Sequence, residues 1–299
     1  MPSSSLFLRS STTLATVLSL LSVSAAQDVY NLATSYQGDD FLDTSKFNYF
    51  TGQDPNHGFV TYLDKGSALN AGIMGSQNGV FYMNVDQTTV LDPTKPYKTE
   101  TGYGRSSVRI ESTQRWTKGL WVADLGRMPG STCGLWPAFW TLGNNWPTNG
   151  EIDIIEGVNN RDYRISVLHD GQDGSVIDTN DAGTGTVANS DCYYDTATGA
   201  GAVGCVIKDA PGSYGDGFNN GGGRIVAMEW TSDAIKVWSF LHSSAPGDIN
   251  SANPNPNNWG EATQIFTGDD LNIDGNFDAH QFIFNTKYGI CYHSHSNVD

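Results

Sequence analysis

The sequence predicts an all-β protein, a two-sheet sandwich of the jelly-roll kind. Short runs of alternating apolar residues recur along the chain and are separated by glycine, asparagine and aspartate turns. Glycine accounts for 34 of the 299 residues, and no segment of about ten residues has the apolar period of a helix. Many short strands at close spacing are typical of sandwiches and jelly rolls.

The expected strands follow one another at short intervals. A hairpin is predicted at 223–240, where two alternating runs flank the polar turn "TSD". The stretch 171–222 is rich in glycine and asparagine, so we expect long loops over one end of the sandwich, where binding surfaces are common. The proline-rich stretch 252–260 should be a surface loop. The other predicted strands are 58–64, 79–86, 106–112, 119–125, 135–143, 151–157, 164–170 and 280–285.

The first 26 residues read as a secretory signal peptide, with a positive start, a short apolar run and small residues before Gln27. No linker or repeat divides residues 27–299, so we expect one domain, secreted and monomeric. The net charge of −16 disfavours nucleic acid and anionic membrane surfaces as partners. A neutral ligand is compatible with this charge.

The chain has four cysteines, which allow two disulfides and three connectivities in an oxidising compartment. Cys192 and Cys205 close the shortest loop and are the preferred pair. The cysteine spacing matches no zinc pattern, so we expect no metal centre built on thiolates.

The stretch "NGEIDIIEGVNN" (149–160) places three carboxylates in a strand that is otherwise apolar. Residues two apart share a face, so Glu151 and Asp153 point the same way, but strict alternation would turn Glu156 to the other face. A β-bulge at Ile154 and Ile155 would absorb one residue and bring Glu156 to the same side.

With the bulge, the two glutamate backbones would lie ~13 Å apart at ~3.3 Å per residue, and their carboxyl groups within roughly 5–7 Å. Retaining glycoside hydrolysis uses carboxyl groups ~5–5.5 Å apart and inverting hydrolysis ~6.5–9.5 Å, so the estimate favours retention without excluding inversion. Asp153 between the glutamates would help one of them keep a proton while the other stays ionised. Two alternatives are a solvated strand with clustered charges and a calcium site.

Aromatic residues precede this strand. Trp136, Trp140 and Trp146 lie within "LWPAFWTLGNNWPTNGE", and flat rings can stack on the apolar faces of sugars while neighbouring amides such as Asn145 bind hydroxyls. Each tryptophan also has a core interpretation, because tryptophan is heavily buried on average. His169 and Glu229 lie at the ends of later strands. Each either lines the site or has a structural role only, His169 as a hydrogen-bonded strand-end residue and Glu229 as a solvent-facing one.

The stretch "GLWPAFWTLGNNWPTNGEIDIIEGVNN" resembles the active-site region of glycoside hydrolase family 16, in particular fungal secreted endo-1,3(4)-β-glucanases. The segments "GRSSVRIES", "GLWVADLGRMPGSTCG", "SYGDGFNNGGG" and "MEWTSDAIKVWSF" are similar to the same family in the same order. The resemblance implies a concanavalin-like jelly roll with a substrate cleft across its concave sheet, and retaining hydrolysis. It also implies that Glu151 is the nucleophile and Glu156 the acid/base.

The same resemblance implies that Asp153 assists the glutamates, and it places four side chains in or near the cleft: Trp140, Trp146, His169 and Glu229. The sequence departs from the family pattern at Asp170 and after about residue 286, so we expect an atypical or truncated end and a missing final strand. The expected substrate is β-1,3 or mixed β-1,3/1,4 glucan. We expect that no cofactor is required, although a structural calcium ion is compatible with the sequence. The rival functions are transglycosylation and glucan binding without catalysis.

Overall fold

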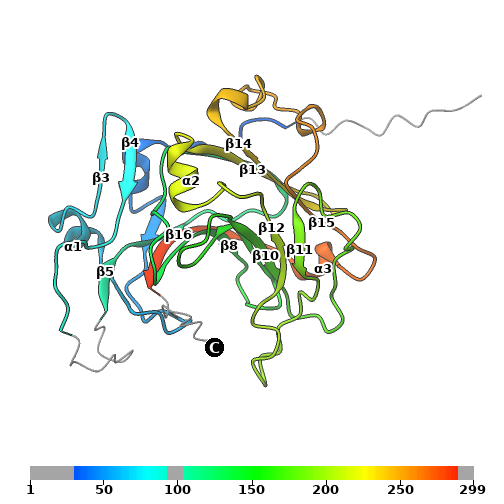
Figure 1. The fold of residues 1–299 in the computed structure, drawn as a ribbon, viewed down its shortest axis with the longest axis horizontal. Helices are drawn as coiled ribbons and strands as arrows, with labels where there is room; N and C mark the ends of the chain where they lie inside the picture. Colours follow the sequence, from blue (N-terminus) through cyan, green and yellow to red (C-terminus); the bar gives the residue numbers. More distant parts are fainter. Residues whose placement is uncertain (1–29, 93–103, 289–299) are drawn as a thin grey trace, which may run out of the picture.

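A computed structural model describes residues 30–92 and 104–288. Two antiparallel sheets form its centre, packed face to face (Figure 1). The larger sheet has eight strands in the spatial order β1 (Phe47–Tyr49), β6 (Arg109–Ser112), β16 (Gln281–Tyr288), β8 (Leu135–Leu142), β9 (Glu151–Glu156), β10 (Ile165–His169), β12 (Cys205–Lys208) and β11 (Thr186–Asn189). The smaller sheet has the order β15 (Gln264–Phe266), β14 (Ile235–Phe240), β13 (Arg224–Trp230) and β7 (Gly119–Leu125).

Two small ribbons, three short α-helices and three 3-10 helices at Gly38–Leu42, His242–Ser244 and Pro256–Asn258 complete the described chain. The strands β2 (Val60–Tyr62) and β5 (Arg105–Ser107) pair in parallel, and β3 (Met74–Gln77) and β4 (Val80–Met83) form a hairpin. The helices α1 (Lys65–Asn70), α2 (Gly215–Asn220) and α3 (Ile273–Asn276) are each shorter than two turns. No helix in the described ranges is long and apolar enough to cross a membrane.

The main core fills the space between the two sheets. Strand alternation produces it: Val226, Met228 and Trp230 of β13 pack inward, as do Phe139 of β8 and Leu168 of β10. A second apolar cluster lies under β1 and β6, around Phe47 and Ile110, and a third covers the outer face of the small sheet. The sandwich therefore leaves one face of the large sheet free of core packing.

The predicted jelly roll is confirmed, and every strand that the alternation indicated is present within a few residues of its expected bounds. The hairpin at 223–240 is β13 and β14. The predicted strand 106–112 divides at Val108 into β5 and β6, which enter different sheets. The stretch 171–222 holds two strands that were not predicted, β11 and β12, whose apolar runs are only a few residues long.

Both ends of the chain carry predictions that the structure leaves untested. The expected signal peptide at 1–26 and all but the first few residues of the predicted atypical end after about residue 286 lie outside the described residues. Strand β16 pairs with β6 on one side and β8 on the other, and it continues to Tyr288. The large sheet therefore has β16 well inside it, not at an edge.

Candidate active site

Strand β9 contains the predicted bulge. Opposite β8, Phe139 pairs with Ile155 and the next residue, Trp140, pairs with Asp153, so Ile154 has no partner of its own. The pairing with β10 shifts at the same place. Ile154 and Ile155 are both buried in the main core, although they are consecutive. The strand thus turns two successive isoleucines inward, which moves Glu156 to the opposite face.

As a result, one cleft on the free face of the large sheet is lined by Glu151, Asp153 and Glu156. We call these three residues the carboxylate cluster. The cavity above them measures about 250 Å³. Its walls come from β8, β10, β11, β12 and three loops. Beside the carboxylate cluster they include Asn56, Trp136, Arg161, Ile165, Val167, His169, Asn189, Val206 and Lys208.

Hydrogen bonds distinguish the two glutamates. The side chains of Trp146 and Asp153 both hydrogen-bond to Glu151, and both bonds favour its ionised form. Glu156 accepts one bond, from Nε1 of Trp136, at 2.6 Å to its Oε1. The Glu151 carboxylate therefore has two side-chain donors, and the Glu156 carboxylate has one.

Burial raises the pKa of all three carboxyl groups. It is the largest cause for Glu151, whose pKa rises to about 7 with a further contribution from the negative charge of Glu156. The pKa of Asp153 lies well above its ordinary range because of burial and the charges of both glutamates. The pKa of Glu156 is also raised, again by burial. The cluster thus retains protons at pH values where isolated carboxyl groups are ionised, and Asp153 gives its proton to a hydrogen bond with Glu151.

His169, at the end of β10, lines the cleft as the resemblance implied. Its Nε2 lies 3.9 Å from Oδ2 of Asp153. Burial lowers its pKa to about 4, so the ring is neutral over most of the pH range. Gly204 packs against it so closely that a Cβ there would lie 2.6 Å from the ring, and its φ of +66° also favours glycine.

Ligand atoms of Glu151, Asp153 and His169 lie within 4.8 Å of one another, a separation that a cation could bridge. A cation there would have to displace the proton that burial and the charges of the two glutamates favour on Asp153, because metal ligands must be deprotonated. We therefore interpret these residues as a proton-sharing group.

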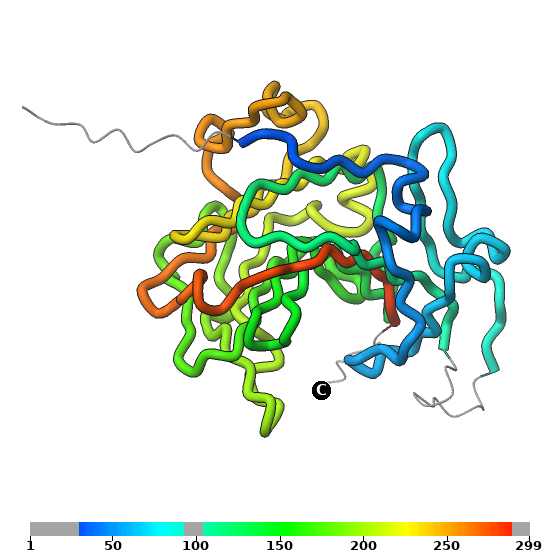
Figure 2. The backbone as a smooth tube through the Cα atoms, turned by 180° about the vertical axis from the view of Figure 1, so that it is seen from behind, coloured from blue at the N-terminus to red at the C-terminus, as the bar shows by residue number. Residues whose placement is uncertain are grey.

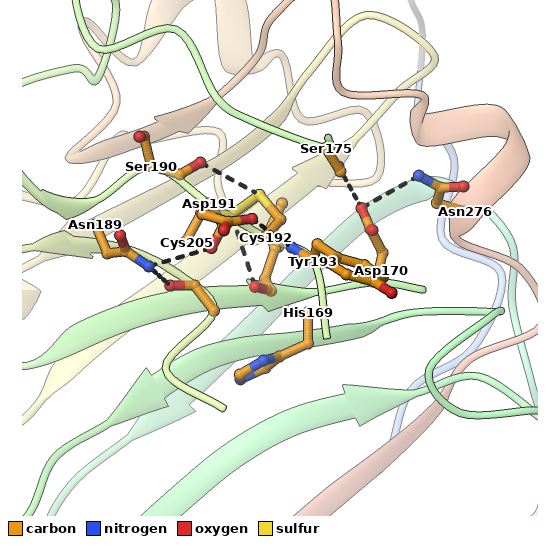
Figure 3. Close-up of a disulfide and its surroundings, with 12 residues drawn as sticks. His169, Asp170, Ser175, Asn189, Ser190, Asp191, Cys192, Tyr193, Cys205 and Asn276 are labelled. Atoms are coloured by element: carbon orange, nitrogen blue, oxygen red, sulfur yellow. Dashed lines mark hydrogen bonds between the residues drawn. A yellow bond between two sulfur atoms is a disulfide. The ribbon is translucent and has the colours of Figure 1, made fainter. Parts of the chain in front are cut away.

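A disulfide-bonded loop forms the wall of the cleft next to Glu151. The predicted bond between Cys192 and Cys205 is present (Figure 3). Buried Asp170 accepts hydrogen bonds from Ser175 Oγ at 2.6 Å and Asn276 Nδ2 at 3.2 Å. The backbone carbonyl of Asp170 accepts a further bond from the Tyr194 amide at 2.8 Å. The backbone of Asp170, where the sequence departs from the family pattern, therefore anchors this loop, and its side chain holds Ser175 and Asn276.

The tryptophans differ in their places. Trp146 is 38% exposed, and its ring centroid lies 4.4 Å from that of Tyr194 on the disulfide-bonded loop. Trp140 lies on the cleft face of β8 opposite Asp153, and its Nε1 donates to Asn285. Asn145 is exposed in the turn before Trp146, and its backbone carbonyl accepts from the Asn149 amide. A role of Asn145 in sugar binding stays a prediction.

The expectation for Glu229 is wrong. It lies on β13 in the small sheet, and its neighbours Met228 and Trp230 point into the core. Alternation therefore turns Glu229 to the outer face, where Tyr30 donates to it at 2.9 Å and Lys236 lies 3.6 Å away. In Figure 2 the blue segment that begins at Tyr30 runs close to the orange segment on this side of the molecule. The alternation of apolar residues around Glu229 was the signal that could have placed it.

The cleft residues that escaped the sequence reasoning include Asn56, Arg161, Lys208 and Lys287. The first three line the cavity from loops or from β12. Lys287 lies on β16 in register with Trp136 of β8 and two residues after Asn285, so alternation along β16 indicates that it faces the cleft.

Residues 47–293 match the model of a known family, the XgeA-like catalytic domain of glycoside hydrolase family 16. The chain belongs to glycoside hydrolase family 16. It is 41% identical over 289 residues to a probable endo-1,3(4)-β-glucanase of Aspergillus fumigatus, an alignment that covers 96% of this chain and 42% of the relative. The chain thus spans less than half the length of this curated relative.

Two solved structures of family 16 are similar to this fold. An elongating β-1,3-glucosyltransferase is 40% identical, with a TM-score of 0.77 and coverage of 86% of this chain and 82% of the other. Laminarinase 16A of Phanerochaete chrysosporium, solved with 6-O-glucosyl-laminaritriose in its donor and acceptor sites, is 34% identical, with a TM-score of 0.79 and coverage of 90% and 88%. The family assignment thus agrees with the sandwich and with the carboxylate strand at its cleft.

Proposed function

We propose that this chain is the catalytic domain of an endo-β-glucanase that hydrolyses β-1,3 or mixed β-1,3/1,4 glucan with retention of anomeric configuration. One observation carries the proposal: the bulge in β9 directs Glu151, Asp153 and Glu156 into one cleft of a family 16 sandwich. A retaining glycosidase needs such a pair of carboxyl groups, one ionised and one protonated. The names of the fungal relatives support the choice of substrate.

In the proposed reaction, ionised Glu151 attacks the anomeric carbon. The bond from that carbon to the glycosidic oxygen breaks, and Glu156 gives its proton to the leaving oxygen. Water then attacks the same carbon while Glu156 takes a proton from the water, and the ester bond to Glu151 breaks. Glu156 ends protonated, Glu151 ends ionised, and the two inversions retain the configuration.

Asp153 serves the nucleophile in this proposal. Its proton lies in the hydrogen bond to Glu151, so Asp153 adds a donor and no second negative charge beside the anion. Trp146 supplies the other donor. The reaction is acid–base and nucleophilic throughout, so the proposed mechanism requires no metal or organic cofactor, and a calcium ion would have a structural role only.

The cleft is suited to a neutral sugar chain. Trp136 and the pair of exposed Trp146 and half-buried Tyr194 offer flat apolar surfaces, and Asn56 and Asn189 offer amides for hydroxyl groups. We further propose that the protein acts outside the cell as a monomer, as the N-terminal sequence and the acidic composition suggest. Size-exclusion chromatography of the secreted protein and sequencing of its N-terminus test both statements.

The decisive experiment measures reducing-sugar release from laminarin and from lichenan. We expect hydrolysis by the unmodified chain and a loss of at least about 10³-fold in Glu151→Gln, which lacks the nucleophile. Glu229→Gln is the matched control: it makes the same change on the outer face of the small sheet and should leave the rate unchanged. Full hydrolysis by Glu151→Gln would contradict the proposal.

A second function has specific support from the glucosyltransferase that is 40% identical to this chain. In that case a sugar hydroxyl replaces water in the second step, and the products become longer than the starting oligosaccharide. Chromatography of the products from laminari-oligosaccharides distinguishes transfer from hydrolysis. Binding without either product would indicate a glucan-binding protein instead.

A further inference from the structure

Lys287 places a buried positive charge beside the carboxylate cluster. It lies on β16 opposite Trp136 of β8. Its Nζ sits 4.1 Å from the centroid of the Trp136 ring, within the range of a cation–π contact. The same ring donates through Nε1 to Glu156. One indole thus contacts the ammonium group with its face and the carboxyl group with its edge.

The ammonium group has few other partners. Its nearest acid outside the cluster is Asp54, whose Oδ2 is 4.0 Å away, too far for a hydrogen bond. That oxygen already accepts from the Gly58 amide at 2.7 Å. Within the described part of the chain the ammonium group makes no hydrogen bond, although only 9% of the Lys287 side chain is exposed. Its charge is therefore directed to the cleft and is little screened by solvent.

The other charged groups around the cleft are accounted for. Arg109 of β6 pairs with Glu111 at 2.7 Å and stacks on Trp140. Arg161 lines the cavity near Glu156, and Lys208 lines it from β12. His169 is uncharged above about pH 4 because burial lowers its pKa. Lys287 is distinguished from Arg161 and Lys208 by its burial, and from Arg109 by its position over the ring that holds Glu156.

We propose that Lys287 is a positioning residue that acts through Trp136 and through its charge to keep the working pH of the two glutamates low. The inference rests on the proposed function of Glu151 and Glu156. Burial favours the protonated form of the three carboxyl groups, and the positive charge of the ammonium group favours their ionised form. The ammonium group also contacts the face of the Trp136 indole, whose N–H donates to Glu156. After burial, Lys287 is the largest influence on the pKa of Glu156, which it lowers; it also lowers the pKa of Glu151 and of Asp153.

The test uses the full chain and the variant Lys287→Met, which keeps most of the apolar stem and removes the charge. Glutamate carboxyl groups are labelled with ¹³C and titrated by NMR, with Glu156→Gln to assign the signal of Glu156. We expect the midpoint for Glu156 to rise by about half a pH unit or more, since a close opposite charge lowers a carboxyl pKa by ~1 unit or more. Lys287→Arg should keep the original midpoint.

Lys236→Met is the matched control, because Lys236 also lies near an acid, Glu229, but on the outer face of the small sheet. It should leave the titration of Glu156 unchanged. Asp54→Asn gives a test of opposite sign, because it removes the competing negative charge near Lys287 and should lower the midpoint. An unchanged midpoint in both Lys287→Met and Asp54→Asn would overturn the proposal, and Asp54→Asn alone decides it if Lys287→Met does not fold.

The titration needs no substrate, so it is independent of the proposed function. For the active protein, we expect both limbs of the plot of kcat/KM against pH to move to higher pH in Lys287→Met and to stay in place in Lys287→Arg. Absence of glucan hydrolysis in the unmodified chain would count against the proposed function alone. A shifted NMR midpoint with unshifted limbs would contradict the role of Lys287 in setting the working pH.

Discussion

At the scale of single residues, three similar carboxyl groups receive different surroundings. Glu151 accepts hydrogen bonds from Trp146 and Asp153, while Glu156 accepts one from Trp136. Asp153 is 4% exposed and donates its proton to Glu151. Environment, more than residue type, thus divides the roles of anion, proton donor and helper among adjacent positions of one strand.

Asp153→Asn tests the helper. The amide keeps a hydrogen-bond donor for Glu151 but cannot exchange a proton with it. We expect kcat to fall by about ten- to a hundredfold, with a smaller change in KM, because proton exchange contributes to the rate and little to binding. Steady-state kinetics on laminarin measure both constants. A variant with unchanged kcat would show that Asp153 supplies only the hydrogen bond.

At the scale of elements, the bulge in β9 decides which side chains share the cleft. One extra residue, Ile154, reverses the alternation between Asp153 and Glu156. Both isoleucines are buried, at 1% and 4% exposure, so the core stabilises the irregular strand. Burial of the two isoleucines therefore determines that the Glu156 side chain points into the cleft.

Deletion of Ile154 should remove the bulge and leave the regular run Glu151, Ile152, Asp153, Ile155, Glu156, in which all three carboxyl groups stay on the cleft face. We expect a lower melting temperature, since one buried isoleucine is lost from the core, and an activity that survives at a reduced level, since Glu156 still faces the cleft but without the local twist of the bulge. Ile154→Val keeps the spacing and is the control; it should cost about 1 kcal/mol of stability and keep the activity within a few-fold. A folded deletion variant with no activity would contradict the interpretation of Ile154 as an extra residue whose only effect on Glu156 is to bring it to the cleft face.

The disulfide-bonded loop is the second element that shapes the cleft. Cys192 and Cys205 are separated by 13 positions, so removal of their bond should cost roughly 3 kcal/mol of unfolding free energy. The double variant Cys192→Ser with Cys205→Ser should also raise KM, because the loop carries Tyr194 against Trp146. Denaturant unfolding and steady-state kinetics measure the two effects. Reduced stability with an unchanged KM would mean that the loop has no part in substrate binding.

At the scale of the whole molecule, the buried ionisable groups make stability depend on pH in two directions. Burial lowers the pKa values of His169 and His280 from 6.5 to about 4. The free energy of unfolding therefore decreases as the pH falls from 6.5 to about 4, because the unfolded state binds protons that the folded state does not. Glu151 has a pKa raised from 4.5 to about 7, so its contribution is lost as pH rises from 4.5 through 7. The protein should thus be most stable at mildly acidic pH.

Glu151→Gln separates the two directions. At pH 8 the unmodified glutamate is ionised in the folded and unfolded states, and its burial penalises the folded state. We expect the variant to be more stable there by ~1–2 kcal/mol, a reduced figure because the cleft still admits water to this side chain. At pH 4 the difference should vanish, since the glutamate is then largely protonated in both states. Thermal unfolding at the two pH values measures it, and equal differences at both would contradict the pKa shift.

The sequence by itself determined the sheets, because strand alternation and turn residues act over a few neighbouring positions. It also determined the carboxylate cluster, since the doubled isoleucine at 154 and 155 leaves a bulge as the way to keep both isoleucines inside. The short loop between Cys192 and Cys205 similarly indicated its disulfide. These features depend on local spacing, which a single sequence displays in full.

Only the tertiary structure decided which distant residues meet the cluster. Lys287 enters the cleft because β16 lies beside β8, although the two strands are far apart in sequence. Glu229 leaves it because β13 belongs to the other sheet, where Tyr30 and Lys236 bind it. Strand order within a sheet depends on the packing of the entire chain. The local sequence pattern around a residue therefore does not predict which residues of other strands lie beside it.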